Sequence, residues 1–190
     1  MNKNKILIVM FLLMTIGFLL YLLNQNESPL SNKHEKAVAL SPSTFFFNSI
    51  QGETIEVNVA DREFNIKGME NKIVFLKVFG WDCKFCQKEI PELVKLKNQL
   101  GDSFDVIAIE AQQHTKEESL KEIERSSINY PIISGEEQKD FYTYLQEKYG
   151  WTGIIPLTIV VAKGGEVLAF ELGAKSYSLS ELMQASLLKK

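Results

Sequence analysis

The chain has 190 residues, of which 45% are hydrophobic and 24% are charged, and its formal net charge is −3 at pH 7. A weakly acidic chain without a basic patch interleaved with aromatic residues lacks the electrostatic footprint of a nucleic-acid binder, so we expect no nucleic-acid partner. The length suffices for one globular domain with a sizeable core.

The first predicted element is an apolar segment, Ile6 to Leu23, that contains no charged residue. As a helix it would be roughly 27 Å long, close to the thickness of a bilayer's hydrocarbon core. Lys3 and Lys5 precede it and favour a cytoplasmic amino end. A cleaved signal peptide is the alternative, but its apolar region usually has about 7–15 residues. We therefore predict that residues 1–23 form an uncleaved signal-anchor, a transmembrane helix that holds the rest of the chain outside the cytoplasm, in the periplasm.

A polar segment, residues 24–43, follows the apolar one and contains Pro29, Pro42, several serines and mixed charges. This composition is typical of a tether. The folded domain is then predicted over residues 44–190. Both cysteines of the chain lie in this domain, and the lack of an unpaired third thiol agrees with an oxidising compartment.

The predicted domain opens with β-strands. Glu53–Val59 alternates polar and β-branched residues, and Glu63–Ile66 follows after a short turn, so the two predict an amino-terminal hairpin. Lys72–Phe79 is an almost continuous apolar run, which fits a central strand buried on both faces.

A helix is predicted from about Lys84 to Leu100, because apolar residues recur there at steps of three and four. Strands and helices then alternate, which predicts an α/β sheet with helices on both faces and an antiparallel pair at one edge. The remaining predicted elements are a strand at Phe104–Ile109, a helix from a Thr115 cap to about Ser126, a short strand at Tyr130–Ile133, a helix at Glu136–Tyr149, paired strands at Ile154–Val161 and Glu166–Glu171, and a final helix capped by Ser178 or Ser180 and ending near Leu188.

The two cysteines form a C-x-x-C motif, Cys83-Lys84-Phe85-Cys86, between the central strand and the helix. A helix N-terminus lowers the pKa of a thiol because its free N–H groups and partial positive charge favour the thiolate. This placement predicts thiol–disulfide exchange, in which exposed Cys83 attacks a substrate disulfide and Cys86, one turn inward, resolves the mixed disulfide.

Two other interpretations of the motif are weaker. A zinc site usually has four ligands, and only His34 in the tether and His114 in a polar loop remain to complete one, so we expect no metal and no other cofactor. A purely structural disulfide across so short a loop would stabilise the domain by only about 2 kcal/mol.

The order of strand, C-x-x-C, helix and a β-hairpin introduced by a proline resembles the thioredoxin fold. Within it, the segment Cys83 to Pro91 is similar to the C-x-x-C-x-x-E-x-P motif of membrane-anchored TlpA/ResA-type thiol–disulfide oxidoreductases. The resemblance covers the chain from about residue 45. It implies a thioredoxin-like α/β fold: a central mixed sheet flanked by helices, an N-terminal β-hairpin and one N-terminal transmembrane helix.

The resemblance also implies roles for site residues. Cys83 and Cys86 would form the redox-active disulfide, and Glu89 would modulate proton transfer and the cysteine pKa values. Without the resemblance, Glu89 reads as an ordinary glutamate on the helix surface. Gly153-Ile154-Ile155-Pro156 stands where the family carries a cis-proline beside the dithiol. A substrate peptide is therefore expected to contact Ile155 and Pro156, together with Trp81.

Two positions depart from the pattern. Lys77 stands where thioredoxins often keep a buried acid; facing inward it would depress thiol pKa values, and facing outward it would do nothing. Asp82 separates Trp81 from Cys83, where tryptophan and cysteine are more commonly adjacent. Both positions bear on the redox potential rather than on the reaction class.

The favoured function is a membrane-tethered extracytoplasmic reductase of protein disulfides. The resemblance implies a membrane electron donor and, as substrate, the haem-binding cysteines of apocytochrome c. A disulfide oxidase or isomerase is the alternative within enzymes, and a peroxiredoxin is weaker because a peroxidatic thiol needs no C-x-x-C partner. A non-catalytic thioredoxin-like binding module is the alternative from another class.

Overall fold

The computed structural model describes residues 43–188, together with Thr15 and Phe18. The predicted signal-anchor, residues 1–23, and tether, residues 24–43, lie outside the described residues, apart from Thr15, Phe18 and Ser43. Thr15 and Phe18 are helical. No helix within the described part of the chain is long and apolar enough to cross a membrane.

The domain begins with a three-stranded antiparallel sheet in the order β1 (Ser43–Asn48), β2 (Thr54–Ala60) and β3 (Glu63–Ile66). The predicted hairpin is confirmed as β2 and β3. Strand β1 was not predicted, and it pairs with β2 in a register that sets Phe47 opposite Ile55. Its alternating burial turns Phe47 into the core while Phe46 faces solvent.

A second, five-stranded sheet has the order β6-β5-β4-β7-β8. Strand β4 lies in the centre, paired in parallel with β5 and antiparallel with β7. The predicted mixed sheet, closed by an antiparallel pair at one edge, is confirmed. The strands are β4 (Ile73–Phe79), β5 (Phe104–Glu110), β6 (Ile132–Ser134), β7 (Leu157–Val161) and β8 (Val167–Leu172).

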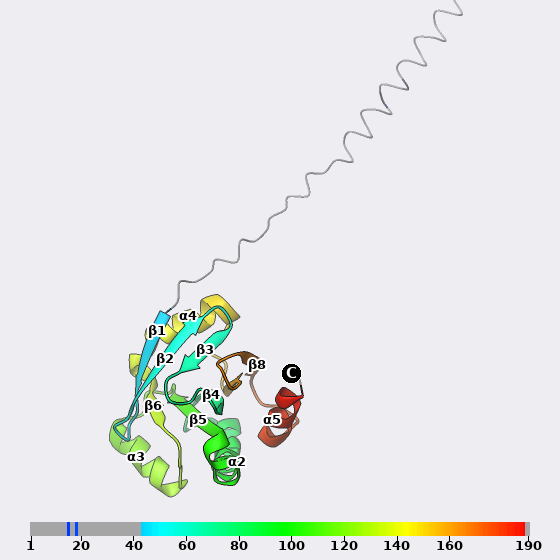
Figure 1. Ribbon diagram of the computed structural model, residues 1–190. Coiled ribbons are helices and arrows are strands. Elements are labelled where there is room, and N and C mark those ends of the chain that lie inside the picture. The colour runs from blue at the N-terminus through cyan, green and yellow to red at the C-terminus, as the bar shows by residue number, and fades with distance from the viewer. Residues whose placement is uncertain (1–14, 16–17, 19–42, 189–190) are drawn as a thin grey trace, which may run out of the picture. The chain divides into compact units, whose positions relative to one another are not determined.

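Helices cover both faces of the five-stranded sheet (Figure 1). On one face, α4 (Lys139–Tyr149) packs with the three-stranded sheet through a core that includes Phe141 and Leu145. On the other face, α2 (Lys84–Leu100) and α5 (Leu179–Leu187) lie against the alternate side chains of β4 and β5. The central strand is therefore buried on both sides, as its continuous apolar run predicts.

The predicted N-caps of two helices are confirmed. Thr115 and Glu118 form a reciprocal capping box at the start of α3 (Lys116–Arg125). Of the two serines considered for the last helix, Ser178 is the cap, and it pairs with Glu181 in the same way.

Three predicted boundaries were too early by two or three residues. Helix α4 begins at Lys139, because a separate 3-10 turn, η2 (Gly135–Glu137), occupies the positions before it. Strands β6 and β7 each begin just after a proline, Pro131 and Pro156, which lacks the N–H that a strand ladder needs. The structure adds one further 3-10 turn, η1 (Gly101–Ser103), after α2.

Candidate active site

Cys83 lies at the junction between β4 and α2 and is the N-cap residue of the helix. Its backbone is extended, with φ −84° and ψ 106°, and its sulfur accepts a hydrogen bond from the backbone N–H of Cys86 at 3.3 Å. The side chain is half-buried. The sulfur of Cys83 therefore occupies the position where a helix N-terminus favours an anion.

Cys86 lies one turn further along α2, and its side chain belongs to the core beneath the helix. It is only 2% exposed. Burial, and secondarily a hydrogen bond with Cys83, raises the pKa of the Cys86 thiol to about 12. Both cysteines are free thiols in the structure. The two sulfurs thus differ in access to solvent, as an attacking and a resolving thiol must.

Lys77 faces inward, which resolves the two orientations that the sequence left open. It lies at the centre of β4 and is 1% exposed. Its Nζ lies 2.7 Å from Oε2 of Glu89, and it also donates a hydrogen bond to the hydroxyl of Thr158 on β7. Burial lowers the pKa of the Lys77 ammonium, while the facing Glu89 carboxylate opposes that shift. A buried ion pair therefore occupies the position that the sequence comparison identified as a departure from the thioredoxin pattern.

The loop before β7 contains a cis peptide bond between Ile155 and Pro156. The indole N–H of Trp151 donates a hydrogen bond of 2.9 Å to the carbonyl of Ile154, which fixes the loop from inside. Pro156 is buried and Ile155 is half-buried, whereas the Ile154 side chain is exposed. Ile155 and Cys83 both border the core beneath α2.

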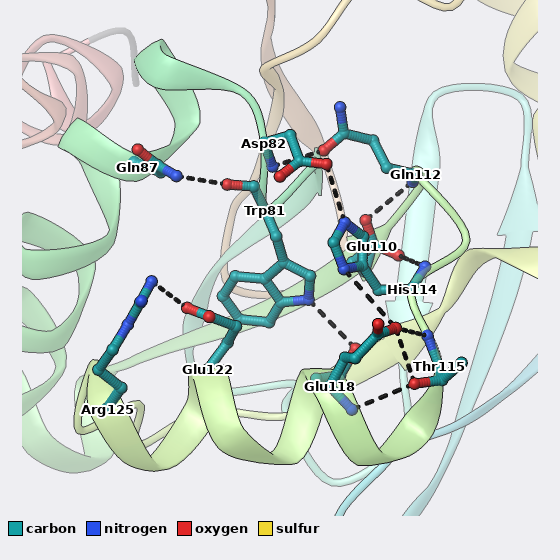
Figure 2. Close-up of polar contacts among 11 residues, drawn as sticks. Trp81, Asp82, Gln87, Glu110, Gln112, His114, Thr115, Glu118, Glu122 and Arg125 are labelled. Carbon is teal, nitrogen blue, oxygen red and sulfur yellow. Dashed lines mark hydrogen bonds and ion pairs between the residues drawn. The ribbon is translucent and has the colours of Figure 1, made fainter.

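Trp81 anchors the chain between β4 and α2. Its buried indole donates a hydrogen bond from Nε1 to the hydroxyl of Ser119 on α3 at 3.1 Å. The side-chain amide of Gln87, on α2, donates a hydrogen bond to the carbonyl of Trp81 at 2.6 Å. Figure 2 shows the Trp81 ring between α2 and α3. The ring also borders a groove of about 280 Å³ between α2 and α3. Substrate contact by Trp81, Ile155 and Pro156 remains a prediction.

A polar network next to Cys83 was missed by the sequence analysis (Figure 2). The side chain of Gln112 accepts a hydrogen bond from the backbone N–H of Asp82 at 2.7 Å, and Nε2 of His114 lies 3.1 Å from Oδ2 of Asp82. The buried Glu110 carboxylate accepts the backbone N–H groups of both Gln112 and His114. This network fixes Asp82, the residue that precedes Cys83.

One signal for this network was present in the chain. Strands β4 and β5 are parallel, and their last residues, Phe79 and Glu110, are paired. The loops that follow two parallel neighbours leave the sheet at the same edge, so residues after Glu110 must lie near the C-x-x-C motif. The glycine at position 80 leaves room for the Gln112 side chain, because a Cβ there would lie 2.1 Å from the amide oxygen of Gln112.

The sequence left two histidines as possible partners of the cysteines in a zinc site. His114 contacts Asp82 instead, and His34 lies outside the described residues. Across residues 43–188, Thr15 and Phe18, no group of three or more His, Cys, Asp and Glu side chains is placed to hold a metal ion. The reactive groups that the structure brings together at the start of α2 are the two thiols, Cys83 and Cys86.

Comparison with known proteins agrees with this chemistry. The profile of the AhpC/TSA family matches residues 42–170. Among curated proteins, the chain is similar to the thiol-disulfide oxidoreductase ResA of Bacillus thuringiensis (strain Al Hakam), with 23% identity over 181 residues that cover 93% of this chain and 92% of the relative.

Solved structures show the fold. A DsbF homologue from Corynebacterium diphtheriae superposes with a TM-score of 0.57 and 20% identity, covering 86% of this chain and 97% of that one. A thiol:disulfide interchange protein of the thioredoxin family from Chlorobium tepidum TLS superposes with a TM-score of 0.56 and 18% identity, covering 77% and 94%. The domain therefore has the predicted thioredoxin-like α/β fold.

Proposed function

This chain belongs to the AhpC/TSA family and is a thiol–disulfide oxidoreductase, and from that premise we propose that it works as a membrane-tethered, extracytoplasmic reductase of protein disulfides. The observation that carries the proposal is the position of Cys83, whose half-buried sulfur caps α2 while Cys86 lies beneath it. A thiolate at a helix N-terminus is both stabilised and accessible.

The reaction follows from the two positions. The Cys83 thiolate attacks one sulfur of a substrate disulfide, forming a mixed disulfide and releasing the other substrate sulfur as a thiolate, which takes up a proton. Cys86 then loses its proton and attacks the Cys83 sulfur. The Cys83–Cys86 disulfide forms, the bond from Cys83 to the substrate breaks, and the second substrate thiol leaves. Two electrons pass from the protein dithiol to the substrate.

The loop at Ile155-Pro156 supports a role in substrate binding. An extended peptide can be held by strand-like hydrogen bonds to backbone that lies beside the reactive sulfur. We propose that the backbone of Ile155 provides these bonds, with Pro156 and Trp81 shaping the surface. Glu89 is proposed to assist proton transfer to and from the dithiol, because it lies on the same helix and pairs with the buried Lys77.

The finer parts of the function rest on the sequence. The apolar segment Ile6–Leu23 supports a membrane anchor, and the C-x-x-C-x-x-E-x-P motif supports apocytochrome c as substrate and a membrane protein as electron donor. An uncleaved anchor predicts that the protein in cells sediments with membranes and keeps residues 1–23 by intact mass. Recovery of a shortened protein in the soluble fraction would contradict the tether.

The substrate is tested by trapping. The Cys86→Ser variant, expressed in a bacterial cell, is expected to accumulate mixed disulfides at Cys83 that contain apocytochrome c, as identified by mass spectrometry. The Cys83→Ser/Cys86→Ser variant is the matched control. Many unrelated secreted proteins on Cys83 would favour an oxidase or isomerase, and the absence of any adduct would contradict disulfide exchange.

A further inference from the structure

The structure places a lysine underneath the dithiol. Lys77 pairs with Thr158 in the register of β4 and β7, and its side chain lies on the same face as Phe75 and Phe79, beneath α2. It is nearly inaccessible to solvent, and its partner Glu89 has a side chain that is 18% exposed. A buried lysine persists when its charge is paired and its donors find acceptors, and here Glu89 pairs the charge while Glu89 and Thr158 each accept an N–H group.

The ammonium of Lys77 is coupled to the inner cysteine. The electrostatic interaction between Lys77 and Cys86 favours the charged form of each group, so it lowers the thiol pKa and raises the ammonium pKa. Cys86 is the sulfur that must become an anion inside the protein, where an unpaired charge is costly. Within the described residues, the other titratable groups coupled to this cluster are the N-cap Cys83, Glu89 and Glu92 on α2, and Tyr130 before β6.

We propose that Lys77 is a positioning residue of the resolving step: its ammonium holds the Glu89 carboxylate below the dithiol and supplies the counter-charge when Cys86 becomes a thiolate. The proposal rests on the exchange function proposed above. It assigns a role to Lys77, which stands where thioredoxins often keep a buried acid. A buried acid accepts a proton, whereas Lys77 stabilises the anion that remains after the proton has left.

The step balances without a further reactant. The Cys86 S–H bond breaks, and its proton passes to the Glu89 carboxylate or to water. The Cys86 thiolate then forms the bond to Cys83 as the bond from Cys83 to the substrate breaks, and the substrate thiolate carries the electron pair away. Lys77 changes no covalent bond, and its charge is the same before and after.

The test isolates the Cys86 thiol in the full-length protein. The Cys83→Ser background leaves one cysteine and keeps a residue that caps helices well. The rate of Cys86 alkylation by iodoacetamide is measured against pH, with and without Lys77→Met and Lys77→Arg. Lys72→Met is the matched control, because Lys72 pairs with Asp105 at 2.8 Å from a position just before β4.

Lys77→Met is expected to slow Cys86 alkylation about tenfold at pH 9, the effect of a one-unit rise in the thiol pKa. Lys77→Arg, which keeps the positive charge, and Lys72→Met are expected to stay within about twofold of the parent, since neither removes the charge beneath Cys86. Parent-like alkylation in Lys77→Met, or equal slowing by Lys77→Arg, would overturn the role of the charge.

A second pair of variants is used if Lys77→Met leaves the Glu89 carboxylate unpaired and the protein fails to fold. The Lys77→Arg/Glu89→Gln and Lys77→Met/Glu89→Gln variants contain no such orphan carboxylate, and arginine stays charged at pH 9, so the second variant is expected to alkylate about tenfold more slowly than the first. Equal rates overturn the proposal. The reaction of Cys83 with substrate disulfides is measured separately in the Cys86→Ser variant, so a failure of the exchange function is distinguished from a failure of the role of Lys77.

Discussion

The sulfur of Cys83 accepts the backbone N–H of Cys86 at 3.3 Å, so the sulfur proposed as nucleophile is also the N-cap of α2. One atom thereby takes part in both the local structure and the chemistry. The free N–H group that would otherwise lack a partner at the helix end is the group that stabilises a thiolate. Reactivity and helix stability are therefore linked at residue 83.

This link predicts different stabilities for two inactive variants. Cys83→Ala removes the cap and is expected to lower the free energy of unfolding by about 0.5–2 kcal/mol, whereas Cys83→Ser retains a side-chain oxygen that can accept the same N–H group. Urea denaturation of the reduced proteins measures the difference. Equal stability of the two variants would show that the sulfur contributes nothing as a cap.

The two thiols are expected to differ in reactivity with pH. Because burial raises the pKa of Cys86 to about 12, very little of the Cys86 thiol is ionised at pH 8. Brief iodoacetamide treatment of the reduced native protein at pH 8, followed by peptide mass spectrometry, is predicted to label Cys83 first. In denaturant both sites are predicted to react alike, and prior labelling of Cys86 in the native protein would contradict the assignment.

The core on the far face of the sheet is expected to affect stability and leave the dithiol chemistry unchanged. Phe141 of α4 is 1% exposed and packs edge-on against Phe45, Phe47 and Phe64. Phe141→Ala is expected to cost about 3–5 kcal/mol of unfolding free energy. Below its lowered melting temperature, it is predicted to keep the parent rate of Cys83 alkylation, and a changed rate would show coupling across the sheet.

The free energy of unfolding is expected to fall in acid because of the ion-pair cluster of Asp105, Lys72 and Lys97, which lies away from the dithiol. Burial alone would raise the pKa of Asp105, but hydrogen bonds from Lys72 at 2.8 Å and Lys97 at 2.6 Å outweigh it, and the net shift is downward from 3.8. A depressed carboxyl pKa stabilises the fold above the unfolded value, and this stability is lost as the pH falls through the folded value.

Asp105→Asn is therefore predicted to flatten the fall in unfolding free energy below about pH 4, and to cost about 1–3 kcal/mol at pH 7. Denaturant titrations between pH 3 and pH 7 provide the measurement. Asp102→Asn, at an exposed position in η1, is the control variant. A pH profile of Asp105→Asn that is parallel to that of the parent would contradict the role of this carboxylate.

The order of elements could be predicted because each has a local signal. The apolar spacing from Lys84 to Leu100 defined α2, and Thr115 with Glu118 marked the start of α3. Strand β1 was missed because its three consecutive phenylalanines hide the alternation that burial makes plain. Its partner β2, in contrast, alternates strictly in sequence.

The orientation of Lys77 could not be predicted, because every residue of β4 is buried and the strand has no polar face to set the phase. Only the packing of α2 and β7 shows that Lys77 meets Glu89 and Thr158. The contacts of Asp82 with Gln112 and His114 depend likewise on the pairing of β4 with β5, which links residues about thirty positions apart. The pairing of the two strands, rather than a pattern within either segment, brings these residues together.

The most direct test of the account is the reaction of the purified Cys86→Ser protein with a small aromatic disulfide reagent, followed by mass spectrometry and release of the coloured thiol. We predict one adduct per protein, located on Cys83, and formed much faster than any adduct on Cys86 of the matched Cys83→Ser variant. An equal or faster reaction at Cys86, or no adduct at Cys83, would contradict the claim that residue 83 is the attacking thiol.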